Sequence, residues 1–172
     1  MKKYSLVTRL LHWITALLVI GLFFSGWYMV QLDYYSPWYH SLPEWHIAAG
    51  LLLALLWLLI LSRLFLPQIK FNQDHSLWER LLSQLVKWSF YLLVILMVIS
   101  GYLITTADGE SFILLNLINI PAISHFSATQ IDNLGLIHQY TSYTLMVLLG
   151  LHIIGALKHH FIDKDDTLKH ML

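Results

Sequence analysis

Four histidines in otherwise charge-free apolar stretches are the residues of this chain whose chemistry stands out. They are His12, His46, His138 and His152. A polar ring inside a membrane is costly unless it faces the interior of a helix bundle and finds a partner there. Imidazole is also the commonest metal ligand among protein side chains. The sequence therefore predicts that each of these rings has a partner at its own depth.

The last apolar run, residues 133–157, holds two of these histidines and no Asp, Glu, Lys or Arg. His138 and His152 are 14 positions apart, which on an α-helix is about four turns and roughly 21 Å of rise, so they share one face. One lies near each end of the run. His12 matches the depth of His152, and His46 matches the depth of His138. The levels therefore predict two pairs, one near each membrane surface.

Four long apolar runs must position these rings. The charge-free stretches lie between Arg9 and Asp33, between Glu44 and Arg63, between Lys87 and Asp108, and over residues 133–157. Each has about the length that crosses a bilayer as a helix. The first is too long for a signal peptide and lacks a small-residue cleavage site, so we expect it to be retained. With 172 residues, 58% of them apolar and 12% charged, the composition indicates one small integral membrane domain. We expect an all-α bundle over residues 1–172, with helices at about 6–31, 44–66, 80–106 and 133–160.

The basic residues predict the orientation of the bundle. All ten flank the same ends of the four runs, namely Lys2, Lys3, Arg9, Arg63, Lys70, Arg80, Lys87, Lys158, Lys164 and Lys169. The connections on the opposite side hold five carboxylates, Asp33, Glu44, Asp108, Glu110 and Asp132, and no Lys or Arg. By the positive-inside rule both termini are cytoplasmic. The cations form no patch on a soluble face, so we expect no nucleic-acid partner.

The second outer connection, residues 108–132, is unusually long and apolar. Residues 112–120 within it resemble a segment that lies on a membrane surface. A loop of this length either caps a site between helices or serves as a connector along the membrane.

Two histidines that face each other at one depth are poor zinc geometry, because zinc needs three or four converging protein ligands. They suit a porphyrin iron clamped between two imidazoles inside a four-helix bundle. The chain has no cysteine, so any haem would be held non-covalently. Gly50, Ser142 and Ala156 each follow a histidine by four positions and would leave room for a flat macrocycle. A proton relay would need Asp or Glu within the spans, and there is none.

Several motifs together resemble the bacterial cytochrome b561 family. They are Arg9-Leu-Leu-His12-Trp13, His46-Ile-Ala-Ala-Gly50, Gly150-Leu-His152, and the tail from His159-His160 to Thr167-Leu168. The likeness covers nearly the whole chain. It implies a four-helix cytochrome of the bacterial inner membrane that holds two b-type haems and exchanges electrons with quinone. By position it implies that His12 and His152 bind the iron of the cytoplasmic-side haem, and His46 and His138 that of the outer haem.

Three cations lie near the expected level of the inner haem. Arg9, Arg63 and Lys158 either hold its propionates through charge-assisted hydrogen bonds or are interfacial cations that reach toward water. His159 and His160 close the last helix, where we expect them to meet its free carbonyl groups.

Two imidazoles on each iron would leave no vacant site for a substrate, so one-electron transfer is the expected chemistry. The leading hypothesis is a di-haem cytochrome that moves single electrons between a donor and the quinone pool in respiratory electron transport. Some cytochromes b561 resemble superoxide oxidases, so the enzyme activity that the likeness offers is superoxide:ubiquinone oxidoreductase. One alternative is a cytochrome b anchor subunit of a larger dehydrogenase or hydrogenase. A non-redox alternative is a small transporter. The expected partners are ubiquinone or another quinone, membrane lipid and, for the anchor, a protein.

Overall fold

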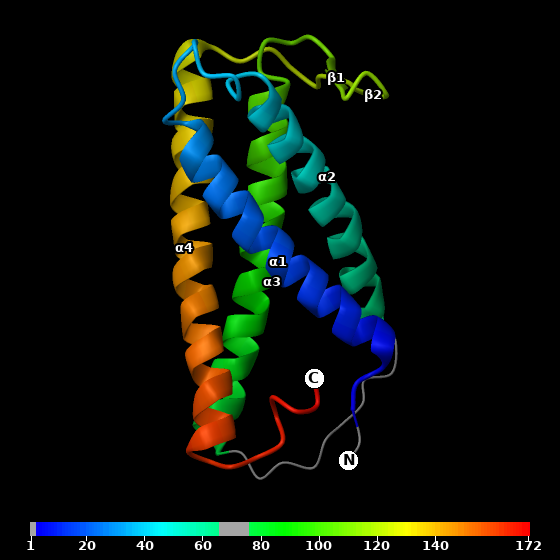
Figure 1. Ribbon diagram of the computed structural model, residues 1–172, viewed down its shortest axis with the longest axis vertical. Helices are drawn as coiled ribbons and strands as arrows, with labels where there is room; N and C mark the ends of the chain where they lie inside the picture. The colour runs from blue at the N-terminus through cyan, green and yellow to red at the C-terminus, as the bar shows by residue number, and fades with distance from the viewer. Residues whose placement is uncertain (1–2, 66–75) are drawn as a thin grey trace.

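A computed structural model describes residues 3–65 and 76–172 of the chain, and long helices make up most of it (Figure 1). The helices are α1 (Leu6–Met29), α2 (Ser41–Ser62), α3 (Leu77–Thr105) and α4 (Ala128–Phe161), and a 3-10 turn at Arg63–Phe65 extends α2. Within the described ranges these four are long and apolar enough to cross a membrane. The chain is a multi-pass, all-α membrane protein, as the sequence predicted. The helix end predicted at residue 66 lies outside the described residues, as do Lys2 and Lys70.

Serine side chains begin three of the helices. At the start of α3, Glu79 N–H donates to Ser76 Oγ at 3.3 Å, and Ser76 N–H donates back to Glu79 Oε2 at 3.0 Å. This reciprocal pair satisfies two backbone donors that a helix start leaves free. At the start of α4, Ser127 N–H donates to Gln130 Oε1 at 2.9 Å. Because this cap sets the start, α4 begins at Ala128, ahead of the charge-free run.

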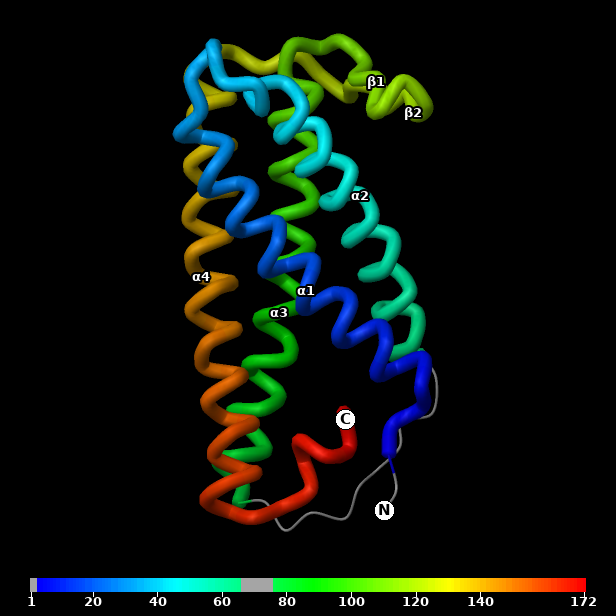
Figure 2. The backbone as a smooth tube through the Cα atoms, viewed as in Figure 1, coloured from blue at the N-terminus to red at the C-terminus, as the bar shows by residue number. Residues whose placement is uncertain are grey.

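The four helices pack chiefly as two antiparallel hairpins, α1 with α2 and α3 with α4. Figure 2 shows α1 crossing α3 at an angle, while α3 and α4 run side by side. Leu53 on α2, Val94 on α3 and Leu145 on α4 form the buried core that joins the hairpins. Few other apolar side chains are buried, and many large ones face outward. Such a surface is expected where lipid rather than water is the solvent.

A small β-hairpin lies at the end of the bundle away from the two termini, beside α2 (Figure 1). Strands β1 (Phe112–Leu114) and β2 (Ile118–Ile120) pair antiparallel. The turn between them places Leu115 and Asn116 at positive φ, 50° and 55°. Leu115 N–H donates to Glu44 Oε1 at 2.8 Å. This bond ties the apolar outer connection to the first turn of α2.

The C-terminal tail turns back under the opposite end of the bundle, where both termini lie (Figure 1). Tyr4 N–H donates to the carbonyl oxygen of His170 at 3.1 Å. Trp13 Nε1 donates to the carbonyl oxygen of Met171, also at 3.1 Å. The tail therefore contacts the start of α1, next to His12.

Candidate functional site

The structure brings the four histidines of the spans together in two pairs. His46 on α2 faces His138 on α4, with ring centres 6.5 Å apart and ring planes at 67°. His12 on α1 faces His152 on α4, with ring centres 6.2 Å apart and planes at 64°. These are the two pairs that helix depth predicted. We call the first the outer pair and the second the inner pair.

The separation of the rings in each pair matches the space that one metal ion needs. An imidazole nitrogen binds a first-row metal ion at about 2 Å, and the ring centre lies about 1.1 Å behind that nitrogen, so two rings on opposite sides of one ion have centres about 6.2 Å apart. The observed separations are 6.2 and 6.5 Å. Two protein ligands do not complete a tetrahedral zinc site. They fit an iron whose other four ligands come from a planar macrocycle.

A serine hydroxyl contacts the Nδ1 atom of each ring in the outer pair. Ser25 Oγ on α1 lies 2.9 Å from His46 Nδ1, and Ser100 Oγ on α3 lies 2.9 Å from His138 Nδ1. Each hydroxyl donates its own proton to a backbone carbonyl of the preceding turn, at 3.1 Å for Ser25 and 2.6 Å for Ser100. With the hydroxyl proton directed to the carbonyl, the serine oxygen accepts from the ring and Nδ1 carries the proton. The tautomer that results leaves Nε2 as the free metal-binding nitrogen of a neutral imidazole.

Glycines next to these serines make room for the outer rings. A Cβ on Gly26 would lie 3.1 Å from Cε1 of His46, and one on Gly101 would lie 3.3 Å from Cε1 of His138. At Gly50, which was expected to leave room for a flat macrocycle, nothing lies within 4 Å of an added Cβ, so open space is present there. Gly26 and Gly101 were not predicted. The signal that could have found them is the Ser-Gly pair that recurs at 25–26 and 100–101.

Aromatic rings surround the inner pair. The ring of Trp13 lies 5.4 Å from that of His12, and the ring of Phe90 lies 5.7 Å from that of His152. Over residues 3–65 and 76–172, the structure places no hydroxyl within hydrogen-bonding distance of either inner ring. The two pairs thus present similar ring separations in different surroundings.

The three cations assigned to the inner level differ in their partners. Arg9 Nε is buried and has no hydrogen-bond partner among the described residues. It fits a site that awaits an anionic group. Arg63 Nη2 donates to Thr8 Oγ1 at 2.9 Å, which ties α2 to the first turn of α1. Lys158 Nζ pairs with Glu79 Oε1 at 2.6 Å and with Asp163 Oδ2 at 2.8 Å. A propionate role for these cations stays a prediction, and Lys158 has two carboxylates as partners already.

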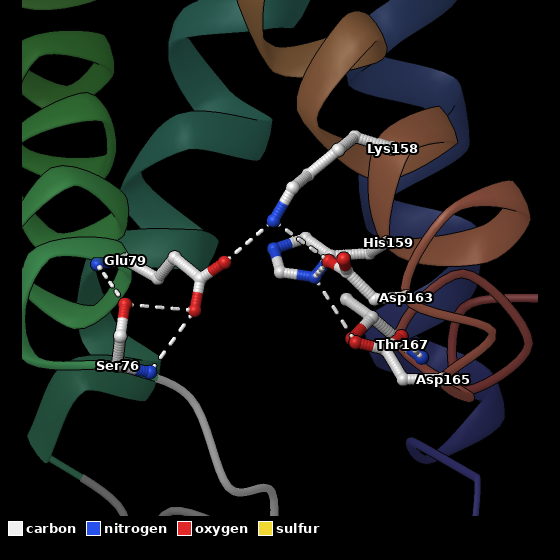
Figure 3. Close-up of polar contacts among 7 residues, drawn as sticks. All are labelled: Ser76, Glu79, Lys158, His159, Asp163, Asp165 and Thr167. Carbon is white, nitrogen blue, oxygen red and sulfur yellow. Dashed lines mark hydrogen bonds and ion pairs between the residues drawn. The ribbon is translucent and has the colours of Figure 1, made fainter.

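The carboxylates around Lys158 also hold a histidine, as Figure 3 shows. His159 Nδ1 lies 2.9 Å from Asp163 Oδ2 and 3.0 Å from Asp165 Oδ2. We had expected this histidine to meet the last carbonyl groups of α4, but its ring contacts side chains of the tail instead. The cluster joins the start of α3 to the end of α4. Its positive charge comes from Lys158, between Glu79 and Asp163, so it serves as an ionic tie between helices.

These observations define a class, a four-helix membrane bundle whose facing imidazoles fit haem iron. The donor set supports this fit, since each pair offers two imidazoles, the outer rings have their tautomer fixed, and Arg9 has a buried unpaired N–H. The chain belongs to the prokaryotic cytochrome b561 family, whose model matches residues 3–172. Membership of this family implies that the protein binds haem b.

Relatives of this chain are similar along almost their whole length. Cytochrome b561 homolog 2 of Escherichia coli (strain K12) is 39% identical over 99% of this chain and 92% of its own length. A probable superoxide oxidase, CybB, of Yersinia pestis is 31% identical over 99% of this chain and 96% of its own. Cytochrome b561 homolog 1 of Escherichia coli (strain K12) is 27% identical over 100% of this chain and 98% of its own.

Proposed function

We propose that this protein is a di-haem electron-transfer cytochrome that passes single electrons from a donor to the quinone pool across the bacterial inner membrane. In this proposal His12 and His152 bind one haem iron, and His46 and His138 bind the other. The observation that carries it is the ring separation of 6.2 and 6.5 Å in two independent pairs. Either pair alone would support one iron, so two pairs support two.

Haem b held by two imidazoles supplies a reversible one-electron carrier with no vacant coordination site. The chain determines where that carrier sits. His138 and His152 are 14 positions apart on one helix, so the two sites are separated by roughly 21 Å along α4. That spacing places one site near each membrane surface. The chain thus provides an electron path across most of the apolar layer.

Superoxide is the proposed donor and ubiquinone the proposed acceptor. Support comes from the relative described as a probable superoxide oxidase, which is 31% identical to this chain. In the balanced reaction each superoxide gives up one electron and leaves as dioxygen. Two such electrons and two protons convert one ubiquinone to ubiquinol.

We further propose that both termini face the cytoplasm. In the sequence all ten basic residues flank the same ends of the four charge-free runs, and the connections at the other ends have five carboxylates and no Lys or Arg. This asymmetry is the pattern that the positive-inside rule describes. The outer pair would then lie toward the periplasm and the inner pair toward the cytoplasm.

Haem stoichiometry and histidine variants test the proposal. The purified protein should contain two haems per chain by visible spectroscopy of the dithionite-reduced form. His46→Ala should remove one haem and His152→Ala the other, with each loss visible as the disappearance of one component in a redox titration. His40→Ala is the matched control, because this histidine contacts Tyr34 and Tyr39 edge to face in the outer connection. A wild-type protein with one haem, or a His46→Ala variant that keeps both, would refute the assignment.

A further inference from the structure

The Ser-Gly pair recurs at 25–26 on α1 and at 100–101 on α3, and in both places it holds an outer histidine of the next helix along the chain. Ser25 contacts His46 and Ser100 contacts His138, each with 2.9 Å between Oγ and Nδ1. The adjacent glycines bring the helix backbone against the same two rings. Each half of the bundle therefore repeats one device, a serine and a glycine on its first helix that fix a histidine on its second.

We propose that Ser25 and Ser100 are positioning residues that lower the reduction potential of the outer haem. The inference rests on the proposed function, since it requires His46 and His138 to be iron ligands. An imidazole that donates its other N–H is a more basic ligand. A more basic ligand stabilises ferric iron relative to ferrous iron. Two such ligands on one iron lower its potential from both sides.

The direction of these hydrogen bonds follows from the serines themselves. Each hydroxyl proton is committed to a backbone carbonyl, at 3.1 Å for Ser25 and 2.6 Å for Ser100. With that proton directed to the carbonyl, the serine oxygen accepts from the ring. In a low-dielectric interior such a chain of hydrogen bonds is stronger than in water, because each bond polarises the next.

The inner pair provides the contrast. Aromatic rings at 5.4 and 5.7 Å surround it, and the described part of the chain places no hydroxyl against its ring nitrogens. The two sites thus share a ligand type and differ in what the ligands donate to. The hydrogen bonds from the ring N–H groups to the serines therefore lower the reduction potential of the outer site and not that of the inner site. An electron that enters at the outer side is therefore driven inward.

A redox titration of serine variants tests the inference on the full-length protein with its haems. In Ser25→Ala and in Ser100→Ala the outer component should move to higher potential while the inner component stays. The double variant should move it further. Ser25→Thr keeps the hydroxyl and should restore the wild-type potential. Ser83→Ala is the control, because Ser83 also donates to a carbonyl of its own helix, at 2.9 Å, and lies 17 positions from Ser100 on α3.

The ferric low-spin electron paramagnetic resonance signal gives a second readout, because its g values depend on the angle between the two ligand rings. We expect the outer signal to change in the alanine variants and to match wild type in Ser25→Thr. Ser25 is only partly buried, so Ser25→Ala keeps the test available if Ser100→Ala does not fold. Two haems with unmoved potentials in Ser25→Ala would overturn this inference alone, as would equal shifts in both components. A wild-type protein with a single haem would instead overturn the proposed function.

Discussion

Replacing Gly26 by alanine measures how closely α1 packs on the outer histidine of α2. The new methyl would lie 3.1 Å from Cε1 of His46, whereas carbon atoms at optimal separation are about 3.5–4.0 Å apart. The ring must therefore retreat by about 0.5 Å or turn away from its preferred rotamer, at a cost of about 0.5–1.5 kcal/mol. Since 1.4 kcal/mol corresponds to about a factor of ten in an equilibrium constant, outer haem affinity should fall by up to about tenfold.

Gly26→Ala should also stabilise α1 itself, in contrast to its effect on the contact with His46. A control glycine separates the gain in helix stability from the loss of haem affinity. Alanine is favoured over glycine in a helix interior by up to about 1 kcal/mol. Gly155→Ala, on α4 and 17 positions beyond His138, is the matched control because nothing lies within 4 Å of its new Cβ. It should keep the outer haem. Gly101→Ala should be intermediate, since its Cβ would lie 3.3 Å from His138 Cε1.

The assay is the haem-to-protein ratio after purification, together with the outer component of a redox titration and thermal unfolding in detergent. Outer haem loss should rank Gly26→Ala first, Gly101→Ala second and Gly155→Ala last. Thermal stability of the helices should not follow that order. If Gly26→Ala retains its outer haem as well as Gly155→Ala does, the close approach of α1 to His46 is wrong.

Three further outcomes are expected. A reporter that fluoresces only in the cytoplasm should be bright when fused after Leu172, and one that works only outside should be active near Asp108; activity of the C-terminal fusion outside would reverse the orientation. Reduction by superoxide should be slow and should quicken as salt screens the five outer carboxylates, so stopped-flow rates that fall with salt would contradict this. Trp13→Phe keeps an aromatic ring beside His12 but loses the 3.1 Å hydrogen bond from Nε1 to the carbonyl oxygen of Met171. Carboxypeptidase should therefore shorten the C-terminal tail faster than in wild type. An unchanged rate would show that this bond does not hold the tail in place.

The pairing of the histidines could be predicted because depth along a helix follows from residue number alone. Rise per residue and alternating helix direction place His12 level with His152 without any knowledge of packing. Helix rise and direction do not show which side chains of neighbouring helices contact each other. Ser25 and His46 meet because α1 and α2 pack at a particular rotation, which depends on the side chains of both helices. The serine contacts therefore emerged only from the structure.

Two local features escaped the sequence for other reasons. The β-hairpin turn uses Leu115 at φ 50°, a conformation in which a large apolar residue is uncommon, so turn chemistry gave no warning of it. Lys158 was assigned to the inner cofactor level from its position at the end of α4. Its partner Glu79 is 79 positions earlier in the chain and is placed by the cap of α3. Long-range ion pairs of this kind depend on which helix ends meet.

Both histidine pairs take one ring from α4, and this fixes when the protein can mature. α4 follows the other three helices in the chain, so His138 and His152 leave the ribosome after His12 and His46. Neither pair exists in a nascent chain that stops short of α4. A metal ion between two facing rings can therefore bind only once α4 has joined the bundle. A chain truncated before α4 would therefore lack both histidine pairs at once.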